Sequence, residues 1–150
     1  MTVGGNFSAT TDANNGVINV GTMAVDGTVA LDTNGNGAAT IVNDAGLTFA
    51  ASTVTGALTA TATTGNITDS GNLAITGAAV FTTGATGSNI ELDSSGNAFA
   101  SQVTMQADDG SEAFGNITFV DSAAIDFATS ASSNGDLFIN AGTDLSLIHI

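Results

Sequence analysis

The sequence contains no lysine and no arginine among its 150 residues, against 14 aspartate and glutamate residues, which gives a formal net charge of −14. A protein without cationic side chains cannot neutralise phosphate groups, so the composition excludes nucleic-acid binding. Attraction to anionic lipid headgroups is excluded for the same reason. The sequence also lacks a run of 18 apolar residues, so we expect no membrane insertion.

Cysteine, proline, tryptophan and tyrosine are also absent, and the single histidine is His149. Without cysteine there are no disulfides, no thiolate nucleophile and no cysteine-based metal site. A chain so poor in histidine, lysine and arginine has few groups for general-base or oxyanion chemistry, so we expect no enzyme. Only paired carboxylates remain, as in glycoside hydrolysis, for example Asp69 and Glu91 on neighbouring turns of a repeat.

The last six residues, 145–150, read like the translation of a transposon end that is used in sequencing libraries. We therefore interpret residues 145–150 as adapter read-through, which makes His149 foreign to the protein. Residues 1–144 are then expected to be a single segment, truncated at both ends. The alternative is a native final strand that ends in an ordinary Ile-His-Ile.

The residues that are abundant favour short strands joined by tight turns. Hydrophobic residues make up 43% of the chain, and threonine, valine, isoleucine and phenylalanine favour strands, whereas asparagine, aspartate and glycine favour turns. Apolar residues recur at every second position, which places them on one face of a strand. Examples are Val29-Ala30-Leu31, Leu47-Thr48-Phe49, Ile90-Glu91-Leu92 and Ile117-Thr118-Phe119.

These short strands repeat with a period of roughly 20–23 residues, which is typical of a solenoid. The spacing is 23 residues from Ile67 to Ile90 and from Val80 to Val103, 22 from Val103 to Ile125, and 20 from Ile117 to Leu137. The pattern predicts an all-β parallel β-helix, with apolar ladders inside, threonine and asparagine outside, and glycine at the corners. The alternative is a β-sandwich surface repeat.

The phrases Gly65-Asn66-Ile67, Gly71-Asn72-Leu73 and Gly115-Asn116-Ile117 resemble the repeats of filamentous-haemagglutinin-type adhesins of bacteria. This resemblance implies a parallel β-helix that forms a structural or adhesive segment of a large secreted or cell-surface protein. It also implies an extracellular location and binding to host or surface glycans or proteins. Uncovered end coils lead us to expect end-to-end self-association as well.

The string Asp32-Thr33-Asn34-Gly35-Asn36-Gly37 matches the first half of a calcium-binding loop. It predicts Asp32, Asn34 and Asn36 as Ca²⁺ ligands, although the twelfth position holds Asn43 instead of an acid. The acidic residues Asp108, Asp109 and Glu112 suggest a second calcium site, and a solvated loop tip is the alternative interpretation. The function alternatives are thus a calcium-dependent extracellular binding module and a β-helix carbohydrate-active enzyme fragment. A plain solenoid corner without a metal or other cofactor is the competing interpretation of the string.

Overall fold

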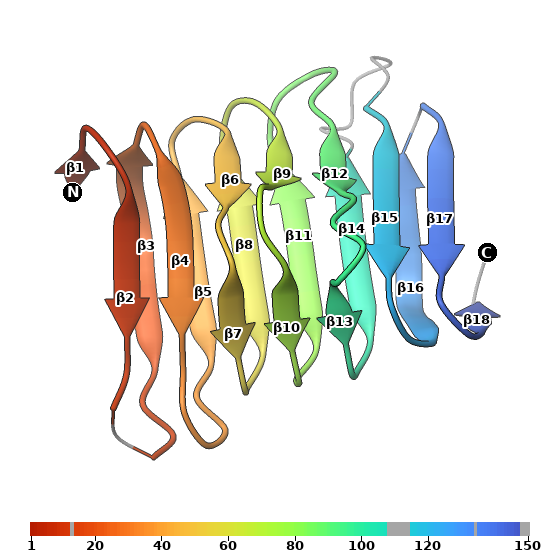
Figure 1. Ribbon diagram of the computed structural model, residues 1–150. Helices are drawn as coiled ribbons and strands as arrows, with labels where there is room; N and C mark the ends of the chain where they lie inside the picture. Colours follow the sequence, from red (N-terminus) through yellow and green to blue (C-terminus); the bar gives the residue numbers. More distant parts are fainter. Residues whose placement is uncertain (13, 108–114, 134, 148–150) are drawn as a thin grey trace.

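In the computed structural model, the chain winds into a β-solenoid of about 6 turns whose strands stack about 21 residues apart (Figure 1). The structure describes residues 1–12, 14–107, 115–133 and 135–147, and this part of the chain contains no helix. All strand pairs within each sheet are parallel. The predicted all-β parallel β-helix is therefore confirmed, and the β-sandwich alternative is wrong.

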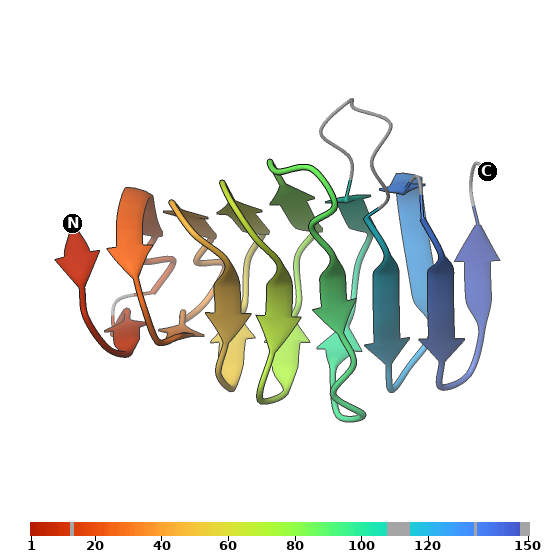
Figure 2. The same ribbon diagram turned by 90° about the horizontal axis from the view of Figure 1, so that it is seen from above.

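Each turn runs down one sheet and back up a second sheet that faces it, as the two layers in Figures 1 and 2 show. This arrangement follows from the sequence, because two groups of apolar-x-apolar residues alternate in every repeat. In spatial order, the eight-stranded sheet consists of β1 (Thr2–Val3), β3 (Ile18–Val25), β5 (Ala39–Asn43), β8 (Leu58–Ala62), β11 (Ala79–Thr83), β14 (Val103–Ala107), β16 (Ile125–Ser133) and β18 (Leu145–Leu147).

The ten-stranded sheet divides after β4 (Thr28–Asp32) into two branches, which are the upper and the lower one in Figure 1. It divides because the chain bends in the middle of three successive turns, so that each of these turns contributes two short strands to the sheet. The sheet starts with β2 (Phe7–Thr10) and β4. The upper branch continues with β6 (Leu47–Phe49), β9 (Ile67–Asp69), β12 (Ile90–Leu92), β15 (Ile117–Asp121) and β17 (Leu137–Ala141). The lower branch continues with β7 (Ser52–Val54), β10 (Leu73–Ile75) and β13 (Ala98–Phe99).

The register confirms two of the predicted equivalences and corrects the other two. Ile67 pairs with Ile90, and Ile117 pairs with Leu137, as their spacing predicts. Val103, however, pairs with Ala79 and Phe127, not with Val80 and Ile125. The corners differ in length, and the strand pair β14–β16 contains an irregularity after Val103, so spacing alone does not identify the partner.

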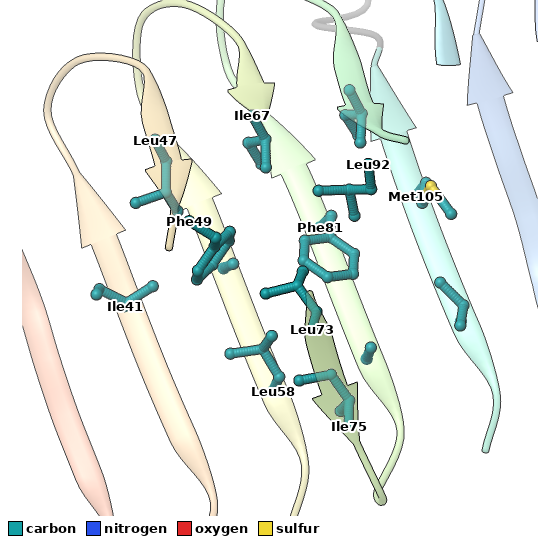
Figure 3. Packing of buried hydrophobic residues seen from close by; sticks show 14 of the residues in the cluster. Ile41, Leu47, Phe49, Leu58, Ile67, Leu73, Ile75, Phe81, Leu92 and Met105 are labelled. Carbon is teal, nitrogen blue, oxygen red and sulfur yellow. The ribbon is translucent and has the colours of Figure 1, made fainter. Parts of the chain in front are cut away.

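The core between the sheets consists of apolar ladders that run along the rod (Figure 3). Leu47, Ile67, Ile90 and Ile117 form one such ladder, and each is at most 1% exposed. Burial of a side chain of this size contributes about 1.5–3 kcal/mol. A chain of phenylalanine rings with centroids 4.9–6.2 Å apart crosses between the sheets and comprises Phe49, Phe81, Phe99, Phe119 and Phe127.

Candidate functional site

The predicted calcium string forms the corner between β4 and β5. Asp32 is the last residue of β4, and Asn34 and Asn36 are exposed on the turn that follows. The buried Thr33 hydroxyl donates a hydrogen bond to the Gly37 carbonyl over 2.8 Å, and the Gly37 N–H donates to the Asn34 carbonyl over 3.2 Å. Hydrogen bonds within the protein therefore hold this corner closed.

The same corner stacks on the corner before it, between β2 and β3. The Asn15 side-chain oxygen accepts a hydrogen bond from the Asn36 N–H over 2.7 Å, and the Asn15 N–H donates to the Asn34 carbonyl over 3.0 Å. Gly35 has a φ of +69°, and a Cβ atom there would lie 2.7 Å from the Asn15 side-chain oxygen. Glycine is thus required at this position both by conformation and by space.

Asn43, the residue at the twelfth position of the string, is buried in β5 and not part of the corner. Its side-chain amide donates to the carbonyls of Val25 (3.1 Å) and Gly46 (2.7 Å), and its oxygen accepts from the Val25 N–H (2.9 Å). The structure therefore leaves Asp32, Asn34 and Asn36 as the candidate ligands without a twelfth-position partner. Asp108, Asp109 and Glu112 lie outside the described residues.

The acidic pair Asp69 and Glu91 does not align on one wall of the rod. Glu91 pairs with Thr68, so Asp69, the next residue along β9, points to the other face of the sheet. The Asp69 carboxylate accepts from the side-chain amide of buried Asn97 over 2.6 Å and from the Asp93 N–H over 3.1 Å. Asp69 thus fixes the loop between β12 and β13. Among the described residues, no three histidine, cysteine, aspartate or glutamate side chains gather as a metal site.

Sequence reasoning missed a series of buried polar side chains in or beside strands of the ten-stranded sheet. Each accepts a hydrogen bond from a backbone N–H of the preceding turn. The Ser52 hydroxyl accepts from Leu31 (3.0 Å), the Asn97 side chain from Leu73 (2.8 Å), and the Asp121 carboxylate from Phe99 (3.4 Å). A small polar residue between the apolar pairs, as in Gly96-Asn97-Ala98-Phe99, is the sequence signal that could have revealed them.

Asp121 is the exceptional member of this series, because a carboxyl group is 1% exposed there. Burial raises the pKa of Asp121 above its ordinary value of 3.8, and backbone N–H groups of Ala123, Phe99 and Ser122 oppose this rise. Its second oxygen, Oδ2, has no hydrogen-bond partner in the described part of the chain. Burial of the Asp121 carboxylate therefore lowers the stability of the folded protein.

The outer face of the eight-stranded sheet over β5, β8, β11 and β14 is a regular surface, which we call the threonine face. It consists of two parallel rows of side chains on neighbouring turns. One row is Thr40, Thr59, Val80 and Thr104, and the other is Val42, Thr61, Thr82 and Gln106. None of these eight residues is charged, although the chain carries a net charge of −14.

The outer face of the ten-stranded sheet differs from the threonine face in its charge. Its upper row contains Thr28, Thr48, Thr68, Glu91 and Thr118, and thus one acid. The hydroxyls of Thr48 and Thr68 form a hydrogen bond to each other over 2.9 Å. Asp32 adds a second acid on this side, in register with the exposed Thr53. The two faces therefore offer different chemistry to a partner.

Comparisons with known proteins support the repeat architecture. No helix in the described residues is long and apolar enough to cross a membrane. Neither a curated protein nor a solved structure matches the chain. Residues 36–106, which extend from just before β5 into β14, are similar to a family described as repeats of unknown function (DUF5649).

Proposed function

We propose that this chain is a structural and adhesive segment of a larger secreted or cell-surface bacterial β-helix protein. The observation that carries the proposal is the threonine face, an uncharged array repeated in register over four neighbouring turns. Because adjacent strands lie about 4.8 Å apart, hydroxyl and methyl groups recur along the rod at that interval. Such a surface suits an extended partner with its own short repeat.

Host or surface glycans fit this face better than charged polymers do. Threonine hydroxyls donate and accept hydrogen bonds, and their methyl groups, like those of valine, contact the apolar faces of sugar rings. A net charge of −14 repels anionic polymers and favours neutral ones. The rod itself contributes rigidity, because each turn is stabilised by its neighbours.

The test is binding of the full chain to a panel of neutral and acidic polysaccharides. A variant with Thr59→Glu and Thr104→Glu places two charges on the threonine face. We expect its affinity for the polysaccharide to fall by about tenfold or more, because two hydroxyl groups that hydrogen-bond the glycan are removed and the two new carboxylates lose water on binding. The matched control is Thr53→Glu with Ala74→Glu, which adds two charges to neighbouring turns of the ten-stranded sheet. Equal losses in both variants, or no binding to any polysaccharide, would refute the glycan role.

A further inference from the structure

Three Asn-Gly pairs of the described chain gather at two stacked corners. Asn15-Gly16 lies in the corner between β2 and β3, and Asn34-Gly35 and Asn36-Gly37 lie in the next corner, between β4 and β5. Asparagine followed by glycine is the most reactive context for spontaneous deamidation, because glycine has no side chain to shield its backbone nitrogen. The corner geometry requires glycine at position 35, so the reactive pair is built into the fold.

The three pairs differ in how strongly the fold restrains their reacting groups. At Asn36 the attacking nitrogen would be that of Gly37, which is buried and donates a hydrogen bond to the Asn34 carbonyl over 3.2 Å. At Asn15 the side-chain oxygen is held by the Asn36 N–H over 2.7 Å. The bond from the Gly37 N–H engages the attacking nitrogen of one pair, and the bond to the Asn15 side-chain oxygen restrains the rotation of the reacting amide of the other.

Asn34 has no such restraint. Its side chain is exposed and, within the described residues, neither this side chain nor the Gly35 N–H makes a hydrogen bond. The bonds that hold residue 34 in place involve its backbone, since its N–H donates to the Thr11 hydroxyl over 3.3 Å and its carbonyl accepts from Asn15. The side-chain amide is therefore free to turn towards Gly35.

We propose that Asn34 is a modification site, at which the folded protein deamidates in preference to Asn15 and Asn36. The Gly35 nitrogen attacks the side-chain carbonyl carbon of Asn34, a C–N bond forms, and the side-chain nitrogen leaves as ammonia with the proton from Gly35. Water then opens the cyclic imide at one of its two carbonyl carbons. The products are aspartate, with the original backbone, and isoaspartate, whose backbone runs through the former side chain.

Either product changes the chemistry of the corner. The net charge moves from −14 to −15, because one neutral amide becomes one carboxylate. The new carboxylate lies two residues from Asp32, on the exposed side of the turn. Isoaspartate also lengthens the backbone by one carbon where the Asn34 carbonyl accepts from Asn15 and Gly37, so it loosens the stacking of the two corners.

The experiment is a time course of the purified full chain in mildly alkaline buffer, alongside the same chain unfolded in urea. Trypsin has no cleavage site in a chain without lysine and arginine, so peptides are produced with pepsin and conversion of amide to acid is followed by mass spectrometry. In the folded protein we expect Asn34 to react about fivefold faster than Asn15 and Asn36, the factor that one hydrogen bond provides. In urea we expect the three rates to be similar.

Two results would overturn the assignment. One is a folded-state rate at Asn34 no higher than at Asn15 or Asn36. The other is the same preference for Asn34 in urea, which would make it a property of the local sequence and not of the fold. The matched variant Asn34→Gln keeps the backbone hydrogen bonds of the corner and is expected to abolish the fast phase while Asn15 and Asn36 keep their slow rates.

Discussion

At the scale of single residues, the buried carboxyl group of Asp121 departs from what the interior of a sheet requires. Because burial raises its pKa in the folded protein, the folded state binds the Asp121 proton more tightly than the unfolded state does. The stability that follows from this is fully present below the unfolded pKa of about 4 and is lost as the pH rises through the folded-state pKa.

The variant Asp121→Asn tests this linkage. The Asn97 side-chain oxygen accepts a backbone N–H from the preceding turn, so an asparagine at 121 can likewise keep the hydrogen bond from Phe99. We expect its free energy of unfolding to exceed that of the parent by about 1 kcal/mol at neutral pH, and the difference to shrink towards pH 4. Urea titrations over this range measure it, and Asp26→Asn, at an exposed corner, controls for the loss of one charge.

The predicted calcium ligands Asp32, Asn34 and Asn36 lead to a separate measurement. If they bind Ca²⁺ in the folded state alone, a hundredfold excess over the dissociation constant raises stability by about 2.7 kcal/mol. Asp32→Ala is expected to remove this gain, because it removes the only carboxylate among the three. Thermal melts of both proteins in excess Ca²⁺ and in chelator provide the comparison. Identical melting temperatures of the parent chain in the two buffers would show that residues 32–37 form a solenoid corner that does not bind Ca²⁺.

At the scale of strands and corners, sequence patterns predicted most of the strands and the direction of the ladders. The pair Ile67–Ile90 was recognisable because both residues follow an asparagine corner and precede a polar residue. The predicted pairing of Val80 with Val103 is wrong because Val80 points outward, beside the inward Ala79. Valine is a favourable strand residue on either face of a sheet. Alternation alone could not tell the two apart.

The candidate site was predictable only as a string of residues. Asp32, Asn34 and Asn36 could be identified from their spacing, but the partners that close the corner could not. Asn15 lies 21 residues earlier than Asn36, and only the stacking of turns brings the two together. The same is true of the buried Ser52, Asn97 and Asp121, whose backbone partners belong to the preceding turn.

Two glycines provide a test at this scale, Gly56 at the corner between β7 and β8 and Gly21 within β3. A Cβ atom on Gly56 would lie 2.5 Å from the Asn36 carbonyl oxygen and 2.6 Å from that of Gly37, whereas one on Gly21 meets nothing within 4 Å. We expect Gly56→Ala to lower the free energy of unfolding by about 2 kcal/mol, and Gly21→Ala to change it by less than about 0.5 kcal/mol. Chemical denaturation measures both, and equal effects would contradict the stacked-corner account.

At the scale of the whole molecule, we expect the two ends of the rod to govern its self-association in solution. Leu137 and Phe138, on the last strand of the ten-stranded sheet, are 50% and 59% exposed. We expect the isolated chain to self-associate end to end, and added salt to promote this by screening the charge of −14. Light scattering at rising concentration and salt is the measurement. A chain that stays monomeric under all these conditions would contradict the expectation.

Removal of one whole turn tests whether stability accumulates turn by turn. Deletion of residues 58–78 brings Ala79 into the place of Leu58, with which it is in register. We expect the shortened chain to fold with the same β circular dichroism, a lower melting temperature and a rod shorter by about 4.8 Å. Deletion of residues 58–67, about half a turn, directs the following strand to the wrong sheet and is expected to prevent cooperative folding.

The register between turns has a consequence for how such a protein can change over generations. Since each strand pairs with the strand one repeat away, an in-frame duplication of a single repeat adds one rung and leaves the cross-section of the rod unchanged. The length of the rod can thus change only in increments of one turn. The reach of the protein can be adjusted by recombination between repeats, in fixed steps, without any need to redesign the surface that it presents.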